Sequence, residues 1–590
     1  MLTFFTWGLF TAAFALAGAA IVRCRARGAF IFIAVTAGVV GGLIGWVNRP
    51  TLALMFLAPW GFAILGLFIG ALFGNPSAQQ PREGAGAAFR VALSGAALLG
   101  VVFLLTTHGL FHAEDYRRLL GEPKDAGAFE QDLAAIDTSR LRIVNQDYAT
   151  AIADKMLGDQ AGLGSEAELG AMQISQLNGC FDATVVGATA PAHVCFQHEL
   201  VWVAPLIHNG VFRWLTNHVT HDYVLVSAID PSRKLLVRAV AGRPVTLRYQ
   251  LEGSHLGDDL MRHLRENGYL SQGLTDINFE LDDAGRPWWV AVTFVKRVGF
   301  RGEDSDGVLL IDPETGAITR YALGQAPAWV DRIQPEEIVS NQFDNWGKYR
   351  RGWWNSWTAR ADVVQTSTFA LHLVEGVDGR TYWYTGIASI GNDQSTTGFI
   401  LVDTKTKETR MYHIPGAMED AAQQSAQNTP GARERRYQAS EPILYNLGGA
   451  PTYFMTLSGD DKIPRMYAFV SVRDYQIVGA SDSAPEALRL YQTALRARTS
   501  GAFEQAVRTT KTALGAIERV AEDGDGRGRW LLVRNGNASA QFFVSTALSP
   551  ELKFAQTGDR VRIVYEPGDA NDLPFVTSFD DLDIAVTNPQ

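Results

Sequence analysis

The stretch Gly307-Val-Leu-Leu-Ile-Asp-Pro-Glu-Thr-Gly-Ala-Ile-Thr-Arg320 carries the local pattern from which the fold of this chain can be argued. A run of branched apolar residues is followed by a polar turn and a second short run, which is the signature of a β-hairpin. Pro313 presets the φ angle of the turn, and Gly316 can take the positive φ that the turn requires. Similar segments begin at Tyr223, Gly398 and Met466, so we expect four related hairpins.

Each hairpin is preceded by an aromatic strand, and helix-period segments lie before or after several of them. A sheet with one apolar face needs a helix or a second sheet to cover that face, which explains the alternation. We therefore predict an α+β region of repeated units, each a helix plus an antiparallel β-meander. A linker would occupy residues 113–140, and the four units would occupy residues 141–250, 251–340, 341–430 and 431–500.

The helix, the strand with Trp288 and Trp289, and the strand that ends in the turn Asp312-Pro-Glu-Thr-Gly316 resemble the PepSY domain of bacterial envelope proteins. Four divergent copies would cover residues 141–500. The fourth copy lacks the Asp-x-x-x-Gly turn, and the first has Ser232-Arg-Lys where Thr-Gly is expected. The resemblance implies small extracytoplasmic domains that bind or inhibit partners, some of them beside membrane reductase helices. It supplies no catalytic residues.

The last 90 residues, 501–590, contain five short strand candidates separated by turns, which predicts a small closed β-barrel. The pattern Gly-Asp-x-Val-x-Ile-x-Tyr that starts at Gly558 is similar to OB-fold barrels. OB-like barrels often bind nucleic acid, but a fold does not establish a function. The acidic runs at 522–525 and 580–583 argue against a polyanionic ligand, so we expect a structural or adhesive barrel.

Four apolar stretches open the chain, at residues 2–22, 29–47, 52–73 and 89–110. Their interiors carry no charged side chain, and each is long enough to cross a hydrocarbon core of about 30 Å. A signal peptide is the alternative for the first stretch, but it lacks a basic start and three further stretches follow it. We therefore predict an N-terminal four-helix transmembrane bundle over residues 1–112.

Arginines in the loops between these stretches suggest an orientation. They place the first and third loops in the cytoplasm, and both termini and the large domain outside it, as in a multi-pass protein of the bacterial inner membrane. Cys180 and Cys195 could close a disulfide in such an oxidising compartment. Glycine stripes at 38–45 and 66–74 could form a homo-oligomer seam, although tight packing within one bundle is the simpler interpretation.

Composition excludes several classes of protein. The chain has 590 residues and a formal net charge of -10, which argues against a nucleic-acid binder that depends on phosphate attraction. Three cysteines exclude a disulfide-rich scaffold and a protein with several zinc sites. We find none of the common sequence signatures of hydrolases, nucleotide-binding loops or zinc proteases.

Histidines gather between residues 193 and 221, with a cysteine and carboxylates among them. Imidazole, thiolate and carboxylate are ligands of zinc and copper, although these spacings match no compact motif and surface histidines are the simpler interpretation. His108 and His112 lie four apart and would share a helix face, so haem or metal ligation competes there with an interfacial position. The candidate metal ligands in the cluster are His193, His198, His218 and His221.

The densest aromatic and basic stretch runs from residue 346 to residue 360. Exposed Trp and Arg together would suit a protein partner or anionic lipid head groups, whereas buried Trp would fill the core between two units. Its candidate binding residues are Trp346, Tyr349, Arg350, Arg351, Trp353, Trp354 and Trp357.

These observations lead us to expect a non-catalytic integral membrane protein that displays a repeat domain for binding or scaffolding in the bacterial envelope. Its partners would be membrane lipid and an envelope protein, without nucleic acid, and no cofactor is expected. The first alternative is a membrane redox component that holds zinc, copper or haem. The second is a subunit of a transport or secretion machine.

Overall fold

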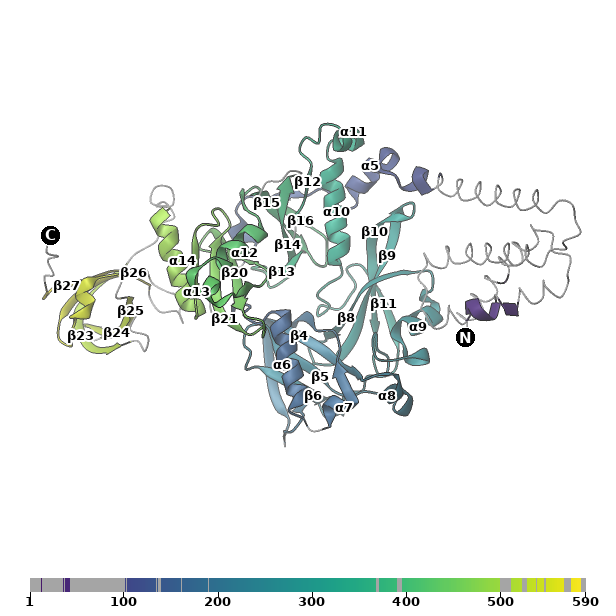
Figure 1. The fold of residues 1–590 in the computed structure, drawn as a ribbon, viewed down its shortest axis with the longest axis horizontal. Helices are drawn as coiled ribbons and strands as arrows, with labels where there is room; N and C mark the ends of the chain where they lie inside the picture. Colours follow the sequence, from purple (N-terminus) through teal and green to yellow (C-terminus); the bar gives the residue numbers. More distant parts are fainter. Residues whose placement is uncertain are drawn as a thin grey trace, which may run out of the picture. The chain divides into compact units, whose positions relative to one another are not determined.

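The computed structural model describes residues 103–133, 140–160, 162–188, 190–367, 371–389, 395–498, 511–522, 528–536, 538–545, 548–566 and 575–584, with residues 12, 35–36, 38–42, 101 and 135. The chain divides into two compact units, Met1–Leu495 and Arg496–Gln590. Strands predominate over helices in the described parts. Figure 1 shows the four sheets of the first unit and the barrel of the second.

The prediction of a four-helix transmembrane bundle over residues 1–112 is contradicted by this structure. Among the described residues, no helix is long and apolar enough to cross a membrane. The longest helices there, α14 (Ala484–Arg498) and α10 (Glu336–Tyr349), would reach only about 22 Å at 1.5 Å per residue. The apolar stretches fall mostly on residues outside the described set, as does the glycine stripe at 66–74. The predicted multi-pass location in the inner membrane depended on this bundle and is contradicted as well.

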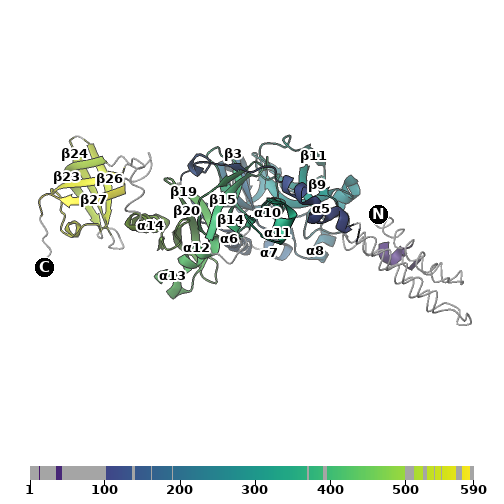
Figure 2. The same ribbon diagram turned by 90° about the horizontal axis from the view of Figure 1, so that it is seen from above.

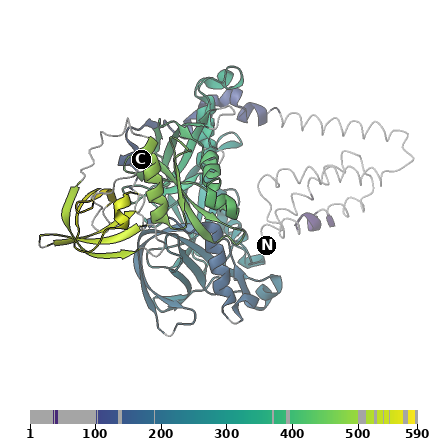
Figure 3. The same cartoon turned by 60° about the vertical axis from the view of Figure 1, so that its left-hand side comes forward.

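The first segment forms a strongly curved sheet, because β3, β4, β5 and β6 pair in a cycle: β4 pairs with both β3 and β5, and β6 pairs with the same two strands. The curvature is visible in blue in Figure 3. The elements are α6 (Gln146–Gly158), α7 (Leu163–Glu166), β2 (Ala167–Leu169), β3 (Gln173–Val185), β4 (Ala192–His208), α8 (Val211–Thr216), β5 (Tyr223–Ser227), β6 (Lys234–Val240) and β7 (Arg243–Pro244).

The second segment is a four-stranded antiparallel meander in the order β11-β10-β9-β8. The helix of this segment is short, because the backbone of Asn267 and Gly268 leaves the helical region. The elements are η3 (Leu256–Asp258), α9 (Leu260–Leu264), the π-turn η4 (Arg265–Tyr269), β8 (Gly273–Leu281), β9 (Pro287–Val298), β10 (Arg301–Ile311) and β11 (Ile318–Ala322).

The third and fourth segments have sheets built on the paths β16-β15-β14-β12 and β18-β20-β21-β22. The third contains α10, α11 (Gly352–Trp357), β12 (Val364–Thr366), β13 (His372–Glu375), β14 (Thr381–Ser389), β15 (Ser395–Asp403), β16 (Thr409–Tyr412) and β17 (Gly416–Ala417). The fourth contains α12 (Glu419–Gln427), α13 (Pro430–Arg435), β18 (Gln438–Ala439), β19 (Ile443–Leu447), β20 (Ala450–Ser458), β21 (Pro464–Ser471), β22 (Val478–Ser481) and α14.

Within the segment expected to be a linker, residues 113–140, the described residues 113–133 contribute elements to the fold. These residues contain the end of α5 (Gly109–Arg118), then β1 (Lys124–Asp125) and η1 (Phe129–Gln131). β1 pairs in parallel with β16, and Phe129 and Leu133 are buried in the core between the third and fourth sheets. The apolar side chains that it adds to that core explain why this segment is ordered.

The sheets are buried on both faces, so side chains of one strand alternate between two cores. In β14, Tyr382 and Tyr384 point into the core shared with the fourth sheet, whereas Trp383 points toward α10. In β4, Val201 and Val203 face the second segment, and Trp202 faces α6. Burial on both sides explains why these strands are continuously apolar rather than alternating with polar residues.

A tryptophan in each of three central strands connects its sheet to the chain segment that leads into the neighbouring helix. Each indole N–H donates a hydrogen bond to a main-chain carbonyl in that segment. The pairs are Trp202 to Val144 (2.8 Å), Trp289 to Tyr249 (2.8 Å) and Trp383 to Gln334 (2.7 Å). The fourth segment has Phe454 in β20, facing α14. The three bonds satisfy buried polar groups where helix and sheet meet.

The second unit is a closed five-stranded barrel with strand order β23-β24-β25-β27-β26, seen from the side in Figure 2. Its elements are β23 (Lys511–Glu522), β24 (Gly528–Asn535), β25 (Ala538–Ser545), η5 (Pro550–Lys553), β26 (Arg560–Glu566) and β27 (Phe575–Asp581). The core inside it includes Ile517, Leu531, Phe542 and Ile563. Closure removes the free sheet edges that an open sheet of this size would leave.

Candidate functional site

The aromatic and basic stretch lies on α10 and α11. One face of α10 packs Val339, Phe343 and Trp346 against the third sheet. The helix ends at Tyr349, and Gly352, the first residue of α11, takes a φ of +80°, a conformation that residues with a Cβ rarely adopt. The chain then continues into the short helix α11, which lies beside α5 (Figure 1).

The candidate binding residues of this stretch divide into a buried and an exposed set. Trp346 is stacked on Phe343 and only 4% exposed. Tyr349 is 7% exposed and packs so closely on α5 that a Cβ on Gly109 would overlap its hydroxyl. For these two residues the core-filling interpretation is therefore the correct one.

The tryptophans of α11 form an exposed cluster. Trp353 is half-buried, with its ring 6.0 Å from the imidazole of His108. It contacts Trp354 edge-on at 4.8 Å and stacks with Trp357 at 6.1 Å, measured between ring centroids. Trp354 and Trp357 are 65% and 67% exposed. We call Trp353, Trp354 and Trp357 the Trp face.

Cationic side chains flank the Trp face in the sequence. Lys348, Arg350, Arg351 and Arg360 are all exposed, and Asp362 is the only carboxylate between residues 346 and 362. Arg350 lies over the ring of Trp346 at 5.2 Å, and Arg351 forms an ion pair with Asp362. Four cations against one carboxylate make this region basic in a chain whose net charge is -10.

The candidate metal-binding histidines do not gather around one point. His218 contacts the buried carboxylate of Asp258 through Nδ1 at 2.7 Å, with 54% of its side chain exposed. The Nδ1 atom of His221 lies 3.0 Å from the carbonyl oxygen of Val245. His198 is exposed in a strand irregularity, where its φ is +47° and its carbonyl accepts a bond from Arg140. None of these three joins a group of metal donors with His193 in the described residues.

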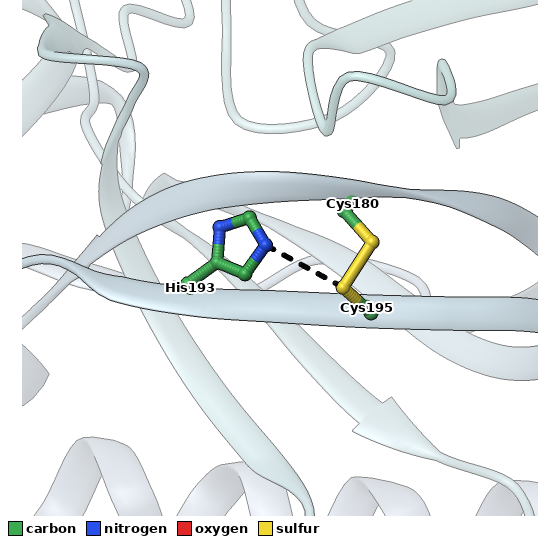
Figure 4. Close-up of side chains that lie close together, drawn as sticks. All are labelled: Cys180, His193 and Cys195. Atoms are coloured by element: carbon green, nitrogen blue, oxygen red, sulfur yellow. Dashed lines mark hydrogen bonds between the residues drawn. A yellow bond between two sulfur atoms is a disulfide. The ribbon is translucent and has the colours of Figure 1, made fainter.

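His193 lies instead beside the cysteine pair on the β3–β4 hairpin. Cys180 and Cys195 are cross-strand neighbours joined by a disulfide. The Nε2 atom of His193 is 3.6 Å from Sγ of Cys195 (Figure 4). The Nδ1 atom of His193 is 2.8 Å from a carboxylate oxygen of Asp182. The two cysteines and the histidine are all exposed.

His108 and His112 are engaged in local contacts around the start of α5. His108 caps the helix, since its Nδ1 accepts the N–H of Leu110 at 3.1 Å. His112 contacts Asp115 through Nδ1 and the carbonyl of Leu105 through Nε2. The bond to Asp115 raises the pKa of His112. Both ring nitrogens of His112 thus have partners in the protein.

A cavity of about 250 Å³ lies where the first, third and fourth segments meet. Its charged side chains are largely paired: Arg140 with Glu375 at 3.2 Å, and Glu199 with Arg233 at 2.6 Å. Arg142 donates to the carbonyl of Leu373 at 3.3 Å, and burial lowers its pKa. Most charged groups of the cavity wall therefore have partners within the protein, and these contacts join the first, third and fourth segments.

Buried titratable groups lie between the segments. His372 is 6% exposed, and burial, assisted by the positive charge of Arg142, lowers its pKa to about 4. Burial raises the pKa of the carboxyl groups of Glu280 and Asp331. The latter accepts the main-chain N–H of Gln176 at 2.5 Å, and a guanidinium nitrogen of Arg332 lies 3.7 Å from Glu280. These groups bridge the first, second and third segments.

Asp182 is the residue at these sites that sequence reasoning missed. The signal is a pair of short motifs, Cys180-Phe-Asp182 and His193-Val-Cys195. Side chains two apart on a strand share a face, so antiparallel pairing can bring all four together. The signal becomes readable once the register of the hairpin is known.

Comparisons with known proteins do not assign a family to the chain. No family model and no curated protein matches it. Six chains of solved structures match, among them one described as "Structural mimicry for functional antagonism". That match has 13% sequence identity and a TM-score of 0.10, and it covers 24% of this chain and 83% of the other. A likeness of this size carries no argument about fold or function.

Proposed function

We propose that this protein is a non-catalytic binding protein whose Trp face docks a partner protein. The observation that carries the proposal is the exposure of Trp354 and Trp357 on α11, which directly follows the core-packed helix α10. Trp and Arg are the side chains most enriched among residues that dominate binding energies at protein interfaces. Here the exposed tryptophans lie on α11, and Arg350 and Arg351 form the junction between α10 and α11.

The arrangement suits binding because its support is rigid. Trp346 and Tyr349 fix α10 in the core, and Trp353 packs between His108 and the two outer indoles. The outer rings are therefore held in place by their neighbours before a partner arrives. Such pre-organisation lowers the conformational entropy that binding would otherwise cost.

The energy available from the two outer rings is substantial. Each tryptophan can bury roughly 200 Å², of which about two thirds is exposed here, so covering both would contribute about 6–7 kcal/mol before the cost of association. The flanking cations favour carboxylates on the partner. We therefore expect a protein segment that combines apolar with acidic side chains.

The test is a selection from a display library of random 16-residue peptides on the immobilised full-length protein. We expect enrichment of acidic, apolar sequences. Trp354→Ala with Trp357→Ala should weaken their binding at least tenfold, about 1.4 kcal/mol. Reversing charge with Arg350→Glu and Arg351→Glu should weaken acidic peptides and leave neutral ones unchanged.

Phe212→Ala is the matched control, because Phe212 is 81% exposed on α8, away from the stretch. It should leave peptide binding unchanged. The proposal fails if the enriched peptides bind the double tryptophan variant as tightly as the wild type, or if no peptide is enriched. Binding of anionic phospholipid vesicles that depends on the same two tryptophans would also overturn the assignment to a protein partner.

A further inference from the structure

The β3–β4 hairpin places four side chains with metal-site chemistry at the corners of one small square. Cys180 and Asp182 lie two apart on β3, and His193 and Cys195 lie two apart on β4. The register pairs Cys180 with Cys195 and Asp182 with His193. Residues two apart on a strand point to the same face, so all four side chains meet there.

We propose that, once the disulfide is reduced, Cys180, Cys195 and His193 bind a thiophilic cation such as Zn²⁺. Two thiolates and one imidazole nitrogen are ligands that this ion commonly takes in proteins. The donor atoms of the three residues already lie within 4.8 Å of one another. The exposure of the three residues leaves the fourth coordination position to water or to a ligand from outside.

The distances support this geometry. In a tetrahedral site with Zn–S of about 2.3 Å and Zn–N of about 2.0–2.1 Å, sulfur and nitrogen lie about 3.6 Å apart. Nε2 of His193 and Sγ of Cys195 are separated by 3.6 Å. The histidine is thus placed as a zinc ligand next to one sulfur, and the second sulfur needs only to separate from the first.

Asp182 gives the histidine the correct tautomer. Its carboxylate accepts a hydrogen bond from Nδ1 of His193 at 2.8 Å, so Nε2 keeps a free lone pair on the side of Cys195. A carboxylate that holds the far nitrogen of a ligating histidine is the usual outer-sphere partner in zinc sites. This contact distinguishes the hairpin from a disulfide that merely has a histidine nearby.

Reduction of the disulfide and binding of Zn²⁺ are two successive steps. A dithiol reductant supplies two electrons and two protons, the Cys180–Cys195 bond breaks, and the reductant closes its own disulfide. Zn²⁺ then displaces one proton from each thiol and forms two Zn–S bonds, while Nε2 of His193 donates its lone pair. A two-electron oxidant such as diamide reverses the sequence and releases the ion. The hairpin is therefore a zinc site that opens and closes with the thiol redox state.

The test is Zn²⁺ binding to the full-length protein with Cys24→Ser as background, so that Cys180 and Cys195 are the only thiols. Affinity is measured by competition with a chromophoric chelator, anaerobically and before and after reduction. We expect one equivalent bound by the reduced protein, none by the oxidised protein, and release by diamide. Co²⁺ should give thiolate-to-metal charge-transfer absorption in the reduced protein alone.

Variants separate the roles of the side chains. His193→Ala should weaken Zn²⁺ binding at least tenfold, and Asp182→Asn by roughly 10- to 100-fold. His198→Ala, a histidine on the same strand outside the square, should change nothing. Cys180→Ser with Cys195→Ser should not bind Zn²⁺ at this site. If this double variant fails to fold, the oxidised wild type serves as the non-binding reference. Equal Zn²⁺ affinity in the reduced and oxidised proteins, or no effect of His193→Ala, would overturn the proposal.

Discussion

Replacing Trp383 with phenylalanine removes the bond between the third sheet and the chain entering α10. Trp383 is 5% exposed, and its indole N–H donates to the carbonyl of Gln334 at 2.7 Å. Phenylalanine keeps an aromatic ring in the core but leaves that buried carbonyl without this donor. A buried polar group left unsatisfied costs about 1–3 kcal/mol. The missing part of the ring adds about 1 kcal/mol, a fraction of the roughly 3–5 kcal/mol for Trp→Ala.

The total destabilisation expected for Trp383→Phe is therefore about 2–4 kcal/mol. The assay is thermal unfolding followed by circular dichroism and calorimetry. If residues 103–495 unfold together, an unfolding entropy of about 2.1 cal/mol/K per residue over roughly 390 residues makes 3 kcal/mol equal to a Tm shift of about 4 °C. If the third segment of roughly 90 residues unfolds alone, the same loss gives about 16 °C.

Trp354→Phe is the matched control, because the same chemical change is made at a ring that is 65% exposed. It should shift stability by less than about 0.5 kcal/mol. The reasoning is refuted if Trp383→Phe lowers Tm no more than Trp354→Phe does. The size of the shift also reports how many segments unfold as one cooperative unit.

Two further predictions concern stability. The pKa of His372 is lowered to about 4 by burial, so the unfolded chain binds an extra proton below about pH 6.5. The contribution of neutral His372 to stability is complete above that pH and falls by up to about 3 kcal/mol as the pH drops toward 4. His372→Gln should flatten this part of a plot of Tm against pH. Parallel curves for the wild type and the variant would contradict the prediction. Gly479→Ala would place a Cβ against the backbone of α14 at Tyr491, and should cost about 1–3 kcal/mol in urea unfolding. Gly127→Ala, with open space around the position, should be nearly neutral, and equal effects of the two changes would refute the close approach of α14.

Part of the candidate site was readable in the sequence, and part was not. The stretch at 346–360 can be identified from its aromatic and basic composition. Composition cannot separate Trp346, which is buried, from Trp357, which is exposed. That separation depends on which side of α10 faces the third sheet and on the break at Gly352. Likewise, the histidines between 193 and 221 are close in sequence, yet only His193 meets the cysteines, because the hairpin register selects it.

Local patterns by themselves determined the hairpins, the aromatic strands and the five strands of the barrel, since turns and short apolar runs depend on neighbouring residues. The pairing of β1 with β16, the sharing of each strand between two cores, and the meeting of Asp182 with His193 were decided only by the tertiary structure. These features join residues that are distant in sequence or fix a register. Their stability comes from burial and hydrogen bonds that exist only once the chain has folded, so no local pattern encodes them.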